Sequence, residues 1–200
     1  MTNISSSIVT ILYNIQLMNL AGEDGVAAYG VIMYVNFIFI AIFIGYSIGS
    51  APIISYHYGA ANHSELKNLF RKSLILNTVA GVVLTAAAEL SAVPLTKIFV
   101  SYDQTLFDLT LRGFYLYSLM FLVCGVNMWG SAFFTALNNG LVSALISFLR
   151  TLVFQVGAVL ILPVFMGIDG IWLSVVAAEV LALFVTVLFF ILKRKQYHYA

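Results

Sequence analysis

Four charged residues stand inside or at the edge of long apolar stretches, where a charge needs a partner or water. They are Glu89, Arg112, Arg150 and Glu179. Counted along helices, Arg150 and Glu179 lie deepest, at depths that two long side chains can bridge. We predict that they form a buried ion pair that braces two helices, with a role in transport as the alternative. Glu89 and Arg112 are candidates for a second pair near the outer surface.

Polar residues also recur at helical spacing in the first apolar stretch, at intervals of four, three and four: Asn3, Ser7, Thr10 and Asn14. Such a stripe does not face lipid. It either bonds to a neighbouring helix or forms one wall of a wet cavity. Asn36 and Asn127 are single polar groups at depth. We expect the cavity-lining residues to be Ser7, Thr10, Asn14, Asn36 and Asn127.

The stretch Gly45-Tyr46-Ser47-Ile48-Gly49 has the G-x-S-x-G spacing of hydrolase nucleophiles, but the strand that should precede it is missing. The three histidines fall near predicted helix ends, so no base reaches a mid-helix serine. No residues have metal-site spacing, and the single cysteine excludes a multi-thiolate zinc site. We therefore expect neither an enzyme nor a metal or organic cofactor.

Small residues at Ala41, Gly45 and Gly49 follow the pattern that lets a neighbouring helix approach closely. Close packing is the favoured interpretation of this pattern. Proline removes a backbone donor, so Pro52 is expected to end the helix that carries it. Gly45, Gly49 and Pro52 are thus predicted to act through the backbone, as packing or hinge positions.

The elements that must position these residues are membrane helices. Apolar residues make up 62% of the chain and charged residues 8%, against about 25% charged in soluble proteins. The apolar stretches fit six spans of about 20 residues, which make one six-helix lobe over residues 1–200. The predicted spans are 4–20, 26–51, 74–93, 106–137, 141–163 and 171–192. The fold class is therefore an all-α membrane protein with a six-transmembrane-helix bundle.

The charges support an even number of spans. One side of the predicted bundle receives most of the basic residues, which are Lys67, Arg71, Lys72, Lys193, Arg194 and Lys195. The other side receives most of the acidic residues. By the positive-inside rule, both termini are cytoplasmic in a multi-pass protein of the cell membrane. The net charge of +1 gives no basic field of the kind that nucleic-acid binding requires.

The segment Gly49-Ser50-Ala51-Pro52-Ile53-Ile54-Ser55-Tyr56-His57-Tyr58-Gly59-Ala60 resembles the multidrug and toxic compound extrusion (MATE) transporters. Three further stretches agree with the same family: 14–30, 138–150 and 170–179. The resemblance covers nearly the whole chain. The chain is similar to the C-terminal six-helix lobe of the family, in a DinF/MepA-like branch. It implies half of a twelve-helix transporter that exports amphipathic or cationic compounds by alternating access, in exchange for H⁺ or Na⁺.

The resemblance also implies the partners: the lipid bilayer, a small organic cation as substrate, and a complementary N-terminal six-helix lobe. That lobe belongs either to the missing part of the same chain or to a second polypeptide. Two other functions remain open at this stage. One is a flippase or exporter of lipid-linked precursors or polysaccharides with the same general architecture, and the other is a six-helix channel.

Overall fold

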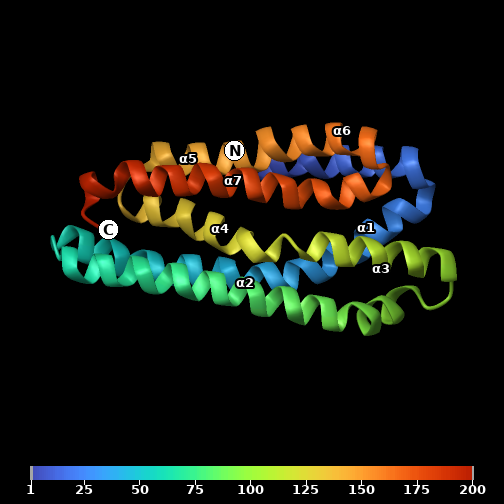
Figure 1. Ribbon diagram of the computed structural model, residues 1–200, viewed down its shortest axis with the longest axis horizontal. Coiled ribbons are helices and arrows are strands. Elements are labelled where there is room, and N and C mark those ends of the chain that lie inside the picture. The colour runs from blue at the N-terminus through green and yellow to red at the C-terminus, as the bar shows by residue number, and fades with distance from the viewer. Residues whose placement is uncertain (1, 200) are drawn as a thin grey trace.

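A computed structural model describes residues 2–199, and the side chains of residues 5–199. The regular structure of these residues is helical (Figure 1). In chain order the elements are α1 (Thr2–Gly59), α2 (His63–Val100), α3 (Gln104–Ser118), α4 (Phe121–Ala136), α5 (Gly140–Phe148), the π-helix η1 (Leu149–Phe154), α6 (Gln155–Met166) and α7 (Ile168–Tyr197).

These elements make six apolar crossings. Four helical segments are long and apolar enough to span a membrane, and the bent pair of α3 and α4 makes a fifth. The sixth arises within α1, which contains two helices joined by a sharp break at Gly22. Figure 1 shows α1 running to one end of the bundle and returning from it. The helices extend beyond most of the six predicted ranges, and Leu137 at the end of the range 106–137 lies just past α4.

Gly22 makes the reversal in α1 possible. Its backbone angles are φ 64° and ψ −149°, a region that is almost restricted to glycine. A side chain at this position forces the backbone into strain. We expect Gly22→Ala to lower the free energy of unfolding by about 1–3 kcal/mol, measured by denaturation in mixed micelles. Gly157→Ala is the matched control, because its Cβ enters open space. An equal loss in both variants would contradict this account.

The fourth crossing is bent, whereas the sequence predicts one continuous span over 106–137. Helices α3 and α4 meet at 49°, with Leu119 and Met120 between them. The cause lies in α2, which packs its backbone against the bend at Gly81. A Cβ on Gly81 would lie 2.7 Å from the carbonyl oxygen of Phe121 and 2.8 Å from that of Leu122. No helix-breaking residue marks the bend in the sequence.

The prediction that Pro52 ends its helix is wrong, because α1 continues through it to Gly59. Pro94 and Pro163 likewise lie inside α2 and α6. In a membrane-spanning helix, neighbouring groups and local adjustments compensate for the backbone donor that proline lacks. The positions of the prolines therefore do not give the ends of these spans.

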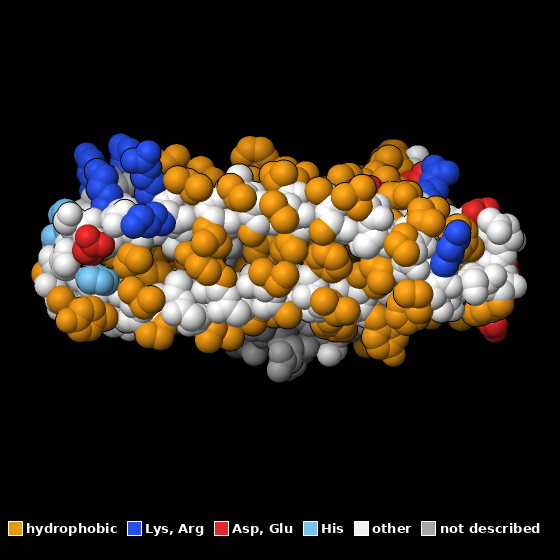
Figure 2. Space-filling model, turned by 90° about the horizontal axis from the view of Figure 1, so that it is seen from below, with side chains coloured by type: hydrophobic (Ala, Val, Ile, Leu, Met, Phe, Trp, Pro, Cys, Tyr) orange, Lys and Arg blue, Asp and Glu red, His pale blue; other side chains and the backbone are white. Residues whose placement is uncertain are grey.

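The two ends of the bundle differ in charge. Figure 2 shows lysine and arginine side chains gathered with histidine at one end, most acidic side chains at the other, and a wide apolar band between them. The beginning of α2 and the end of α7 share the basic end, because the rings of His63 and His198 lie 4.8 Å apart. Figure 1 places the start of α1 partway along the bundle rather than at this end.

Buried side chains fill two clusters along the bundle. One includes Tyr13, Phe121 and Trp172. The other, nearer the basic end, is a group of stacked and tilted aromatic rings: Phe70, Trp129, Phe133, Phe134, Phe190 and Tyr199. The fully buried Tyr199 donates a hydrogen bond to the carbonyl oxygen of Phe190 and ties the C-terminal residues to this cluster. Burial first, and the neighbouring Tyr197 second, raise the pKa of Tyr199.

Candidate functional site: a buried ion pair and a hydroxyl-lined groove

The structure brings Arg150 and Glu179 together. Both Nε and a terminal guanidinium nitrogen of Arg150 lie 2.7 Å from Oε1 of Glu179. The Glu179 side chain is 6% exposed and that of Arg150 is 20% exposed. A pair this deeply buried is held by strong charge-assisted hydrogen bonds, and removal of one partner leaves an uncompensated charge.

Asn127 adds a third helix to the pair. Its Nδ2 donates to Oε2 of Glu179 and to the backbone carbonyl oxygen of Glu179, both at 2.8 Å. The carboxylate therefore has a partner on each oxygen, one from η1 and one from α4. The amide oxygen of Asn127 is also buried but has no hydrogen-bond partner. The three side chains link α4, η1 and α7 in the interior of the bundle.

Arg150 belongs to the π-helical segment Leu149–Phe154, which interrupts the α-helical course of the fifth crossing. A π-helical turn widens the backbone and changes which side chains face the interior, and such turns occur frequently at functional sites. The segments before and after it are α-helical. Since the sequence here has no glycine or proline, its local pattern does not reveal the π-helix.

The second predicted pair is wrong. Arg112 on α3 bonds to Asp169 in the first turn of α7, and not to Glu89. Glu89 instead accepts a hydrogen bond from the hydroxyl of Ser118 at 2.5 Å. Helical counting placed Glu89 and Arg112 at similar depths, but depth alone does not say which helices are neighbours.

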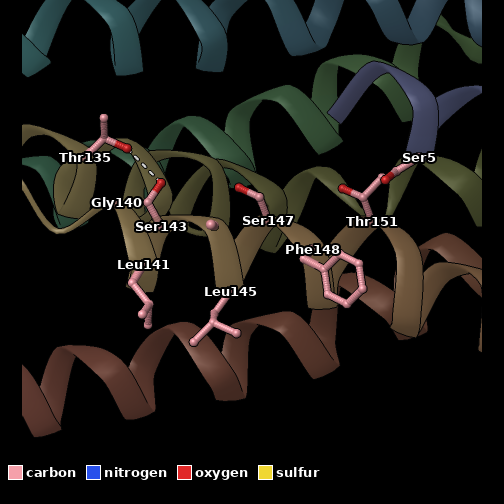
Figure 3. A pocket seen from close by; sticks show the side chains of 10 residues that line it. Ser5, Thr135, Gly140, Leu141, Ser143, Leu145, Ser147, Phe148 and Thr151 are labelled. Atoms are coloured by element: carbon pink, nitrogen blue, oxygen red, sulfur yellow. Dashed lines mark hydrogen bonds between the residues drawn. The ribbon is translucent and has the colours of Figure 1, made fainter. Parts of the chain in front are cut away.

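A groove of about 500 Å³ opens between the start of α1, the end of α4, and α5 with η1. Its polar lining is made of hydroxyl groups, with no charged side chain among the lining residues: Ser5, Thr135, Gly140, Leu141, Ser143, Ala144, Leu145, Ser147, Phe148 and Thr151. Figure 3 shows Thr135 bonded to Ser143 at one end of the groove and Ser5 beside Thr151 at the other.

Hydrogen bonds connect the groove hydroxyls to one another. Ser131 on α4 lies 2.9 Å from the hydroxyl of Ser143 and 2.8 Å from that of Ser147, and Thr135 lies 2.7 Å from Ser143. The groove is thus a neutral surface of hydroxyls that can donate or accept, beside the apolar side chains of Leu145 and Phe148. Thr135 also lines a second hollow, of about 510 Å³, together with Pro52 of α1.

These hydroxyl residues were not among the predicted site residues. A signal was present, because Ser131 and Thr135 are four residues apart, and so are Ser143, Ser147 and Thr151. Residues at this spacing share one face of a helix. A short turn at Asn138 and Asn139 joins α4 to α5. The sequence does not record which faces of these two helices meet.

The predicted polar stripe divides as follows. On the first helix of α1, Val9, Tyr13 and Leu17 are buried. Ser7 and Thr10 are exposed on the other side, and Asn14 lines a shallow hollow there. Thr10 donates to the carbonyl oxygen of Ser6. The side chain of Asn3 lies outside the described side chains. The open face of this helix therefore carries these polar residues among the exposed apolar side chains of Ile8, Ile11 and Ile15.

Asn36 and Asn127 do not line an open cavity, contrary to the prediction. Asn36 is buried among Ile32, Phe114 and Phe121, and its amide oxygen has no partner. Asn127 is fully buried against Glu179. The sequence indicated polar groups at depth but not which of them turn inward into the bundle.

Gly45 and Gly49 face outward. A Cβ added to either one would meet nothing within 4 Å, so the predicted close packing is not made by any described part of this chain. Ala41 and Pro52 on the same helix are exposed as well. Ser47 lies in the middle of a continuous helix rather than on a strained turn, so the hydrolase arrangement is not formed. Among the described residues, no three metal-ligating side chains cluster.

The model of the MatE family matches residues 1–161. The chain belongs to the MatE family. The MatE match covers most of the crossings described above, including Arg150 and the hydroxyl groove. Among functionally curated proteins, no sequence matches significantly.

Solved structures of MATE transporters share the fold, which confirms the all-α membrane bundle. An outward-facing multidrug resistance MATE transporter matches with a TM-score of 0.90 at 20% identity, over 100% of this chain and 45% of that one. The inward-facing form matches with a TM-score of 0.87 at 20% identity, over 98% and 44%. The Vibrio cholerae MATE transporter VcmN in its bent form matches with a TM-score of 0.85 at 18% identity, over 97% and 43%. This MatE chain thus spans less than half the length of the transporters that it resembles.

Proposed function

We propose that this MatE chain forms the C-terminal half of a secondary active exporter, of the DinF/MepA-like type, that moves amphipathic or cationic compounds in exchange for H⁺ or Na⁺. A complementary N-terminal six-helix lobe completes the transporter. The complete transporter lies in the cell membrane, with the basic end of this bundle in the cytoplasm. No organic or metal cofactor is required in this proposal.

One observation carries the proposal. The second helix of α1, which carries Pro52, leaves its small residues Gly45 and Gly49 uncovered. They lie beside a hollow that is lined by both Pro52 and Thr135. Thr135 also borders the hydroxyl-lined groove. A self-contained bundle would cover such small and polar groups with its own helices, because groups of this kind drive helix association in lipid. The match covers 43–45% of the solved transporter chains. The uncovered surface therefore fits a half-transporter that packs against a second half.

The relatives occur in outward-facing and inward-facing forms, so alternating access is the mechanism to which such a surface is suited. In alternating access, two halves rock about a central cavity. A neutral hydroxyl surface next to Phe148 and Leu145 binds the apolar body and the polar groups of an amphipathic compound without holding it too tightly for release.

The test is efflux of a fluorescent organic cation from cells that contain this chain together with the complementary lobe. Ser147→Phe places a large ring in the groove and is expected to reduce the efflux rate about tenfold or more, equivalent to about 1.4 kcal/mol of lost binding. Asn14→Leu is expected to reduce it as well. Thr78→Phe is the matched control, because Thr78 is exposed on α2 and lines neither hollow. Normal efflux by Ser147→Phe would rule out the groove as the substrate path.

A further inference from the structure

We propose that the start of α2 binds an anionic glycerophospholipid of the leaflet at the basic end of the bundle. The site is a hollow of about 370 Å³, which we call the basic groove, lined by Lys67, Phe70, Arg71, Leu74, Ile75 and Tyr199. Its ligand carries a phosphate anion and apolar chains in one molecule. The inference goes beyond the proposed transport function and does not rest on it, because this ligand is held and not exported.

The basic groove lies apart from the surfaces that we assign to transport. Figure 1 shows α2 along the opposite side of the bundle from α5, which forms a wall of the hydroxyl-lined groove. The residues that line the basic groove line neither the hydroxyl-lined groove nor the hollow beside Pro52. A ligand in the basic groove therefore does not occupy the proposed path of the substrate.

The groove offers two cations to one anion. Lys67 and Arg71 are four residues apart on α2, so they share one face of the helix, and both are exposed. Among residues 5–199, no carboxylate forms an ion pair with either of them. The acidic residue nearest in sequence, Glu65, accepts a hydrogen bond from Nδ2 of Asn68 at 3.2 Å. The ammonium and guanidinium groups can therefore both donate charge-assisted hydrogen bonds to the same phosphate.

An apolar track continues from the cations into the membrane. Helix α2 runs from the basic end along the apolar band of the bundle (Figures 1 and 2). Beyond Arg71, the groove is lined by Leu74 and Ile75. The exposed side chains of Val79 and Val82 follow Ile75 at intervals of four and three, and so extend the same face. A soluble anion would use the cations alone, whereas a phospholipid uses the cations for its headgroup and this track for a chain.

The C-terminal residues hold the other wall of the groove in place. The buried Tyr199 donates a hydrogen bond to the carbonyl oxygen of Phe190 at 2.9 Å, and its ring lies 4.7 Å from that of Phe70. The ring contact between His63 and His198 joins the same two chain segments. The wall is therefore formed before a ligand arrives, which lowers the entropic cost of binding. The end of α7 also adds basic residues to this end of the bundle: Lys193, Arg194 and Lys195.

The experiment is native mass spectrometry of the purified chain in detergent with phosphatidylglycerol and phosphatidylcholine in equal amounts. We expect the chain to retain phosphatidylglycerol preferentially. The double variant Lys67→Gln, Arg71→Gln should weaken the binding of phosphatidylglycerol by about thirtyfold, because each cation contributes about fivefold. It should leave the binding of phosphatidylcholine unchanged. The matched control is Arg194→Gln, Lys195→Gln, which removes the same charge from the same end of the bundle but outside the groove and should have a much smaller effect.

A second pair of variants tests the apolar track without a change of charge. Leu74→Trp fills the groove and should weaken the binding of phosphatidylglycerol, whereas Leu76→Trp, at an exposed position that does not line the groove, should not. The proposal is overturned if the chain does not prefer phosphatidylglycerol, or if both charge variants weaken its binding equally. Displacement of the lipid by an equal concentration of glycerol phosphate, which lacks the chains, overturns it too. These measurements do not involve efflux, so they are independent of the test of the transport function.

Discussion

Arg150→Met is expected to lower the free energy of unfolding of this chain by about 3–5 kcal/mol near neutral pH. The variant leaves the buried carboxylate of Glu179 without the cation that now lies 2.7 Å away. The Glu179 side chain is 6% exposed, so water cannot take the place of the lost cation. The measurement is denaturation in mixed micelles, followed by the helical signal.

The double variant Arg150→Met, Glu179→Met should recover most of that stability. Two apolar side chains of similar volume replace the ion pair, and such replacements are often neutral or better. Recovery would identify the pair as a brace whose members act together, since the effect of one depends on the presence of the other. If the double variant is as unstable as the sum of the two single variants, Arg150 and Glu179 act independently and the brace interpretation fails.

Gly81→Val is expected to be about as disruptive as the worst overpacking substitutions, with a loss of about 3 kcal/mol. Its Cβ would lie 2.7 Å and 2.8 Å from two backbone carbonyl oxygens at the bend between α3 and α4. Backbone atoms cannot rotate away as a side chain can, so α2 must separate from the bend. Unfolding in mixed micelles measures the loss, and cross-linking between α2 and α4 measures the separation.

Gly45→Val is the matched control, because a Cβ there meets nothing within 4 Å in this chain. It should change the stability of the isolated chain by no more than about 0.5 kcal/mol. In the complete transporter, the same substitution tests whether another lobe covers Gly45. A large loss in the isolated chain would mean that Gly45 is packed and that the surface assigned to the second lobe is covered.

The basic end of the bundle and the apolar crossings follow directly from the sequence. Long apolar stretches are forced to become helices in a bilayer, because no other open structure satisfies the backbone groups of a spanning segment. The turn signals at Gly22 and Asn139 lie between crossings in the structure. Prolines misled the prediction of helix ends, since Pro52 and Pro94 lie inside helices that continue beyond them.

Counting along the helices shows which residues are polar at depth, whereas the packing of the helices fixes which of them meet. Depth follows from counting along a helix, and so Arg150 and Glu179 were recognised as possible partners. Neighbourhood depends on how helices pack, which is why Arg112 bonds to Asp169 and Asn127 joins the ion pair. The bend between α3 and α4 has the same origin, because Gly81 on α2 packs against it. Gly81 and Phe121 lie far apart in the chain, and no local pattern records that they meet.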